Sequence, residues 1–224
     1  MFDDPFIKVL AITFVVLAFI FGFILFGYFI YKYNRTGSKK YNFLTYFPFE
    51  LNGYRRHASS SFIDVSLMIV TYLLLIVPVV IFAIFSNLPS SYIMLAVYIF
   101  ALTIFACLFF TKLSAFKLHV SFACIFVCLE VLYLLLSLTY YANENSAYVI
   151  NDEVRIIITI FIVLQIIFEI ILIVNPSIKD WAKKVRIDAE TFSRPKYNYL
   201  AMLEWGTFLN FLLNYIVLIL VSFF

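Results

Sequence analysis

Two glutamates lie inside long apolar runs of this sequence. Glu130 is near the middle of the run at residues 116–141, and Glu169 lies in the next apolar run. An ionisable side chain at membrane depth costs roughly 2.5 kcal/mol or more at the bilayer centre, so it tends to face a partner or a water-filled path. Two such residues in consecutive runs indicate a polar or proton-handling route through a membrane.

The surroundings of this acidic pair suit proton transfer. Gln165 precedes Glu169 by one helical turn on the same face. Consecutive helices joined by a modest loop pack as antiparallel neighbours, so Glu130 and Glu169 could approach each other or bracket a short chain of waters. Removal from water and a second nearby carboxylate favour the neutral form of a carboxyl group. We therefore predict a proton path through Glu130, Glu169 and Gln165. The alternative is that each glutamate stays protonated and hydrogen-bonded in a structural role.

The last apolar run carries a second set of polar residues. These are Glu204, Thr207, Asn210 and Asn214, which recur at helical spacing. Polar side chains at membrane depth usually face another helix, where they find hydrogen-bond partners. We predict that this stripe makes polar contacts between helices.

The sequence gives little sign of a catalytic, nucleotide-binding or metal-binding site. The motifs of nucleotide-binding, metalloprotease and serine-hydrolase sites do not occur in the sequence. Cys107, Cys124 and Cys128 lie inside apolar runs, where cysteine behaves as a small apolar residue. His57 and His119 lack the neighbours of a metal ligand or a general base. We expect no catalytic residue, no metal site and no cofactor bound by this chain.

The amino-acid composition indicates that the protein lies in a lipid bilayer. Hydrophobic residues make up 65% of the 224 residues and charged residues 13%, a balance that suits a bilayer and not water. Six apolar stretches are long enough to cross a hydrocarbon layer of about 30 Å. They lie at about residues 6–31, 62–86, 92–111, 118–141, 154–175 and 200–224. Because lipid satisfies no backbone hydrogen bond, the spans must be helical. The sequence predicts an all-α polytopic integral membrane protein with six transmembrane helices.

The basic residues predict the orientation. Of the 16, all but Lys8 and Arg155 fall on one side of this topology, in the segments 32–56, 112–117 and 179–196. The positive-inside rule places these segments in the cytoplasm or matrix and both termini outside. Topology thus explains the net charge of +3, and we expect no nucleic-acid partner.

Two of the inner segments have further features. Residues 41–54 are rich in aromatic side chains, which favour the headgroup zone of a bilayer. Residues 176–196 space their apolar side chains as a surface-lying amphipathic helix does, and a basic linker explains them equally well. Ser61 and Asp64 fit a capping box that opens the second span.

Residues 91–175 resemble the 4L subunit of proton-pumping NADH:ubiquinone oxidoreductase, respiratory complex I. That family has three helices, an inner first loop and a Glu in each of the second and third helices. Glu130 stands in a Leu-Glu-Val-Leu stretch after a basic turn, and Asp152 and Glu153 precede the run that holds Glu169. The resemblance implies that Glu130 and Glu169 are the two acids of a proton path. The chain departs from the family in the bulky residues around Glu169.

The resemblance also implies a cellular role. The chain would be a non-catalytic membrane-arm subunit of the respiratory chain, serving electron and proton transport in the mitochondrial inner membrane or a bacterial plasma membrane. NADH and ubiquinone chemistry would lie in partner subunits, and the chain would contact lipid and other membrane subunits. Residues 1–90 would add two transmembrane helices with a long basic inner loop, and residues 176–224 an inner amphipathic segment and the sixth helix. The alternatives are an accessory or assembly subunit of another large membrane complex, and a small secondary transporter.

Overall fold

The computed structural model describes residues 5–36, 40–48, 50–51, 62–85, 89–111, 116–142, 151–177 and 197–223. Within these ranges the chain forms six α-helices and no strand. The helices are α1 Pro5–Thr36, α2 Phe62–Phe85, α3 Pro89–Phe110, α4 Phe116–Ala142, α5 Asp152–Val174 and α7 Tyr199–Phe223. The prediction of an all-helical protein is confirmed.

Five of the helices are long and apolar enough to cross a membrane, whereas the apolar stretch of α3 is shorter, at Tyr92–Leu108. The protein is therefore an integral membrane protein. Most helix ends lie within a few residues of the predicted span ends, but α1 continues past residue 31 to Thr36. Of the predicted amphipathic segment at 176–196, all but its first two residues lie outside the described residues.

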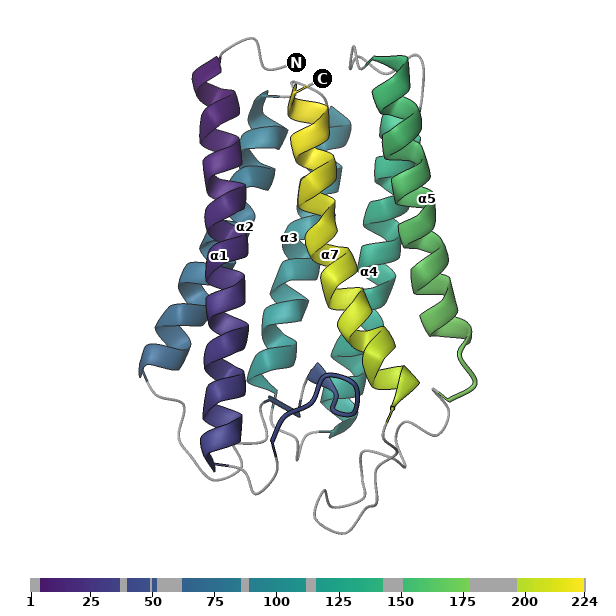
Figure 1. Ribbon diagram of the computed structural model, residues 1–224. Coiled ribbons are helices and arrows are strands. Elements are labelled where there is room, and N and C mark those ends of the chain that lie inside the picture. The colour runs from purple at the N-terminus through teal and green to yellow at the C-terminus, as the bar shows by residue number, and fades with distance from the viewer. Residues whose placement is uncertain are drawn as a thin grey trace.

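The helices alternate in direction along the chain (Figure 1). The N-terminal end of α1 and the C-terminal end of α7 lie at one end of the bundle, which we call the terminal end. The helices α1, α3 and α5 all finish at the other end, which we call the loop end. The three basic segments of the sequence connect helices at the loop end, so the charge asymmetry and the helix directions agree.

Helix α7 contacts every other described helix. It packs against α1, α2 and α5, and it runs between α1 and α5 in the view of Figure 1. Its Phe211 ring stacks on Tyr98 of α3 with centroids 4.9 Å apart and lies 5.1 Å from the ring of Phe126 in α4. One cluster of buried apolar side chains draws on all six helices. Large side chains such as Phe23, which is 71% exposed, cover the outer surface, as contact with hydrocarbon requires.

A buried ion pair joins α1 to α2. The Lys32 ammonium lies 2.6 Å from the Asp64 carboxylate, which also accepts a hydrogen bond of 2.8 Å from the Tyr28 hydroxyl. Asp64 lies in the first turn of α2, as the capping interpretation expects, but its side chain is fully buried and faces α1. The pair explains why α1 continues beyond its apolar run, since Lys32 must stay helical to reach Asp64.

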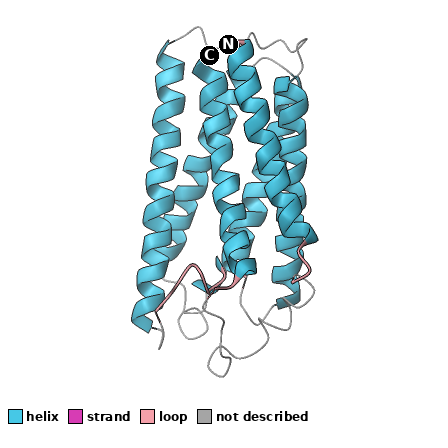
Figure 2. Ribbon diagram, turned by 45° about the vertical axis from the view of Figure 1, so that its right-hand side comes forward, coloured by secondary structure: helices cyan, strands magenta, loops and turns pink. Residues whose placement is uncertain are grey.

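The aromatic segment at residues 40–51 lies at the loop end (Figure 2), and much of it packs into the protein. Tyr41, Tyr46 and Phe47 are buried, whereas Phe43 is exposed. The Trp205 indole of α7 donates a hydrogen bond of 3.2 Å to the Tyr46 carbonyl. The Tyr41 hydroxyl donates one of 2.8 Å to the Phe47 carbonyl, and burial raises the pKa of Tyr41. Contacts with α7 thus hold Tyr41 and Tyr46 against the bundle.

The helix α2 continues through Pro78, which is buried. Proline cannot donate the backbone hydrogen bond to the residue four positions earlier, and it crowds the preceding turn. The Tyr215 hydroxyl of α7 donates a hydrogen bond to the carbonyl of Leu75 in that turn. This contact anchors the terminal half of α7 to α2.

A close approach joins α5 to α7. A Cβ atom added to Gly206 of α7 would collide with the ring of Phe168 of α5. Glu169 and Thr207 are the next residues on the two helices, so the absence of a side chain at Gly206 allows these two polar groups to meet.

Replacing Gly206 with Ala should lower the free energy of unfolding by about 1–3 kcal/mol, because an overpacked contact forces side chains or backbone to shift. Thermal unfolding of the protein in detergent would measure this loss. Gly22→Ala is the matched control, since an added Cβ there meets nothing within 4 Å and alanine favours a helix. Adding Phe168→Ala to Gly206→Ala should recover part of the loss. Equal unfolding temperatures for the two single variants would contradict this account of the contact.

Candidate functional site

The polar residues of α5 lie on its one buried face. The buried positions of this helix are Ile158, Ile162, Gln165, Glu169 and Leu172, whose spacing of three and four residues forms a single stripe. Asn151 caps the helix by accepting a hydrogen bond of 3.1 Å from the backbone N–H of Glu153, which satisfies one of the otherwise unpaired N–H groups of the first turn. Gln165 and Glu169 thus point away from lipid and toward α7.

The facing stripe of α7 meets this pair. Asn210 donates a hydrogen bond of 2.7 Å from Nδ2 to Oε1 of Glu169, and Thr207 donates one of 3.2 Å from Oγ1 to Oε2 of the same carboxyl group. Each oxygen of Glu169 therefore accepts one hydrogen bond. Glu169 is fully buried, and these two bonds offset part of the cost of holding a carboxyl group away from water.

Gln165 extends the network toward the terminal end. Its Nε2 donates to the backbone carbonyl of Asn210 at 2.9 Å and to Oδ1 of Asn214 at 3.2 Å. Asn210 donates in return to the backbone carbonyl of Gln165 at 3.3 Å. Five side chains from two helices thus form one buried network, which we call the α5–α7 network. They are Gln165, Glu169, Thr207, Asn210 and Asn214.

Glu130 of α4 lies beside this network without a bond to it. Its side chain is fully buried, and among the described residues neither carboxyl oxygen has a hydrogen-bond partner. It interacts electrostatically with Glu169. An ionised carboxylate buried without partners costs far more than the neutral acid, so this site favours a Glu130 that carries a proton. The two glutamates therefore occupy chemically different sites.

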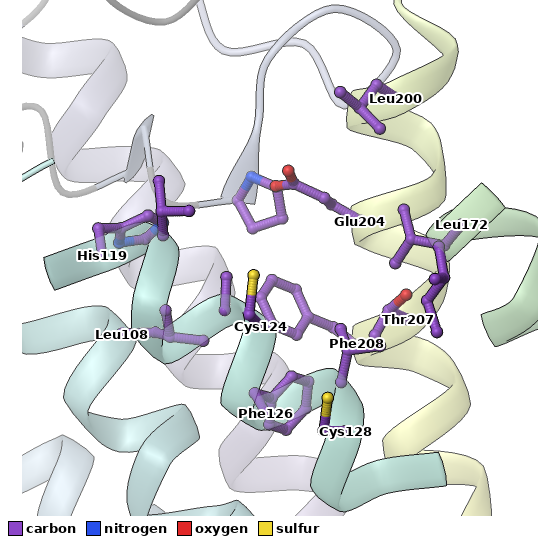
Figure 3. Close-up of a pocket in the computed structure, with 15 residues that line it drawn as sticks. Leu108, His119, Cys124, Phe126, Cys128, Leu172, Leu200, Glu204, Thr207 and Phe208 are labelled. Carbon is purple, nitrogen blue, oxygen red and sulfur yellow. The ribbon is translucent and has the colours of Figure 1, made fainter. Parts of the chain in front are cut away.

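A pocket of about 410 Å³ lies at the loop end between α4, α5 and α7 (Figure 3). Its wall is mostly apolar and includes Leu172, Leu200 and Phe208. Among its few polar groups are the side chains of Glu204 and Thr207, which come from successive turns of α7. Thr207 belongs to both the pocket wall and the α5–α7 network, so the two features meet at one hydroxyl group.

The structure brings most of the predicted residues together. Glu169, Gln165, Thr207, Asn210 and Asn214 join in one network, so the two predicted groups of polar residues pair with each other. Glu130 is near but unbonded. Within the described residues no hydrogen bond joins Glu204 to the network, and its side chain lines the pocket.

Some functional candidates were not apparent from the sequence. His119, which seemed to have no role, is buried and lines the pocket, and His57 lies outside the described residues.

The ion pair of Lys32 and Asp64 was also not predicted from the sequence. Both residues flank the same connection, at the end of one helix and the start of the next, and this shared position was the signal that could have indicated the pair. Among the described residues, no group of His, Cys, Asp or Glu could hold a metal ion.

Replacing Asn210 with Leu should destabilise the protein by about 1–3 kcal/mol, because it leaves buried polar groups of Glu169 and Gln165 unpaired. Unfolding temperature in detergent is the measurement, and Leu209→Ala is the control, since Leu209 is 55% exposed on the outer surface. If the network is real, adding Glu169→Met to Asn210→Leu should cost less than the sum of the two single changes. Strict additivity would contradict the bond between these two side chains.

Comparison with known proteins adds no assignment: no protein-family model, curated protein or solved structure matches this chain.

Proposed function

We propose that this protein carries protons through the interior of its helix bundle, with Glu130 and Glu169 as the groups that hold the proton in turn. The observation that carries the proposal is the difference in hydrogen bonding between two fully buried acids on α4 and α5, helices that pack against each other. Both oxygens of Glu169 are hydrogen-bonded, whereas Glu130 has no such partner among the described residues. A proton gained by one acid changes the cost of ionising the other.

The other network residues would have supporting roles. The Thr207 hydroxyl can both donate and accept a hydrogen bond, so it suits a relay between the pocket at the loop end and Glu169. The amides of Asn210 and Gln165 hold the Glu169 side chain in place. Protons would enter by way of Thr207, reach Glu169, and pass to Glu130 nearer the terminal end.

The proposal includes a topology and a setting. All six helices would cross the membrane, including α3, which packs between α2 and α4. Both termini would lie outside, because the basic segments connect helices at the loop end. By its resemblance to the 4L subunit of complex I, the chain would serve a proton-translocating respiratory complex in the mitochondrial inner membrane or a bacterial plasma membrane. Redox cofactors would be bound by partner subunits, and the exposed apolar surface would contact those subunits and lipid.

Two other functions have specific support. The hydrogen bonds of the α5–α7 network would also serve simply to hold the two helices together. This structural use favours an accessory or assembly subunit. The pocket beside Thr207 is what a small secondary transporter would need for a solute. Proton flux separates these functions, because a structural subunit needs no titrating acid and a transporter couples flux to its solute.

Glu130→Gln and Glu169→Gln should each lower proton flux by on the order of a hundredfold, the scale of losing a proton-transfer group. Flux would be measured in liposomes that contain the purified protein and a trapped pH indicator, under an imposed potassium diffusion potential. Glu153→Gln is the matched control, since Glu153 is an exposed acid at the start of α5.

The outcomes separate the candidate functions. If both Gln variants conduct protons as well as the unaltered protein, the acids are structural and the accessory role replaces the proposal. Flux that appears only when a solute is added would support a transporter. If the isolated protein does not conduct protons, the same variants would be compared in native membrane vesicles.

The proposed setting has its own test, which is blue-native electrophoresis of gently solubilised source membranes with mass spectrometry of the bands. Migration with NADH dehydrogenase activity is the expected result. Migration as a small particle would refute the respiratory complex and favour a transporter. Migration with a different large complex would indicate an accessory subunit.

A further inference from the structure

The pocket at the loop end has an acidic side chain in an apolar wall. Its residues come chiefly from α4, α5 and α7, and Pro48 of the aromatic segment borders it toward the loop end. Cys124 and Cys128 of α4 line the pocket and are also exposed on the outer surface. Ile173 of α5 is likewise both a lining residue and 48% exposed. The pocket is therefore open toward the hydrocarbon of the bilayer.

Glu204 supplies a fixed acidic group at the inner side of this pocket. In Figure 3 its side chain extends from α7 into the space facing α4. Among the described residues its carboxyl group forms no ion pair or hydrogen bond, in contrast to Glu169 on the neighbouring helix. A second acid, Glu50, also disfavours a negative charge on Glu204. A carboxyl group in this position therefore favours its neutral form, as Glu130 does, and a positively charged partner would stabilise its ionised form.

We propose that this pocket binds an amphiphile that has a hydrocarbon tail and a protonated amine head. The tail would lie against Leu108, Val127, Leu172 and Phe208. The amine would donate its hydrogen bonds to the Glu204 carboxylate, with Glu50 adding to the negative potential. The volume of about 410 Å³ lies within the usual range for ligand pockets of about 300–1,000 Å³. An anionic head would meet the acidic Glu204 side chain in the pocket wall, so the charge pattern disfavours it.

Amine binding at this site does not require a proton path, although Thr207 belongs to both the pocket wall and the α5–α7 network. It needs only Glu204 and the apolar wall, and neither Glu130 nor Glu169 lines the pocket. The native cysteines offer a direct measurement, because a bound tail would cover Cys124 and Cys128 on one side of the opening. Cys107, of α3, does not line the pocket and can be replaced with Ala to leave these two thiols as reporters.

The test is the rate at which a fluorescent maleimide labels Cys124 and Cys128 in the Cys107→Ala protein, in uncharged lipid vesicles. Dodecylamine is compared with dodecanol, which has the same tail and no charge. We expect dodecylamine to protect the thiols at a concentration about tenfold lower, which corresponds to about 1.4 kcal/mol. Glu204→Gln should remove this difference, whereas Glu153→Gln should preserve it.

A further control separates binding in the pocket from accumulation in the bilayer. Leu209→Cys, in a protein whose native cysteines are all replaced with Ala, places a thiol on the lipid-facing side of α7, and neither compound should protect it selectively. Equal protection of Cys124 and Cys128 by the two compounds would overturn the proposal and indicate a site for lipid tails only. Selective protection that persists in Glu204→Gln would overturn it too. The comparison of the two compounds decides the matter in the protein with Glu204 intact, even if the Gln variant fails to fold.

Discussion

The hydrocarbon interior of a bilayer offers no hydrogen bonds, and this constraint organises the whole molecule. Polar side chains at membrane depth are costly unless they find partners within the protein, and here the largest group of them finds those partners across the contact of α5 with α7. That contact is close because Gly206 leaves room for Phe168. With α7 held there, its aromatic residues reach α3 and α4, its Tyr215 reaches α2, and its Trp205 holds the segment at residues 40–51. One helix thus links all the others, which also pack directly against their neighbours in the chain.

Much of the fold follows from the sequence by simple rules. Uninterrupted apolar runs specify helices, and the placement of basic residues specifies which helix ends lie together, as the alternating bundle bears out. The depth of Gln165, Glu169, Asn210 and Asn214 in those runs also indicated that they would face other helices. Their actual pairing was not predictable, because helical periodicity gives the face of each residue but not the neighbour. Consecutive helices were the natural guess for Glu130 and Glu169, whereas Glu169 pairs with α7, which follows a long connection.

The same limit explains the features that sequence analysis overlooked. The rule that predicts a headgroup anchor at residues 41–54 considers only lipid and water, so it did not indicate that Tyr46 and Phe47 would be buried in the protein. Glu204 read as part of the polar stripe because it lies one turn before Thr207, yet it faces the pocket. In both cases the folded structure brings a distant part of the chain next to the side chain, and the local sequence does not show this neighbour. Thr207 faces both features at once, so any occupant of the pocket and the charge on Glu169 influence each other's free energy.

The dependence of α5 on α7 also bears on how the protein is made. α5 precedes α7 in the chain, so during synthesis it enters the membrane before the partners of Gln165 and Glu169 exist. A helix with two unpaired polar groups is poorly suited to lie alone among lipid tails. The hydrogen bonds of Gln165 and Glu169 can therefore form only after the ribosome has produced the last helix. The network that stabilises the finished bundle thus belongs to a late step of its assembly.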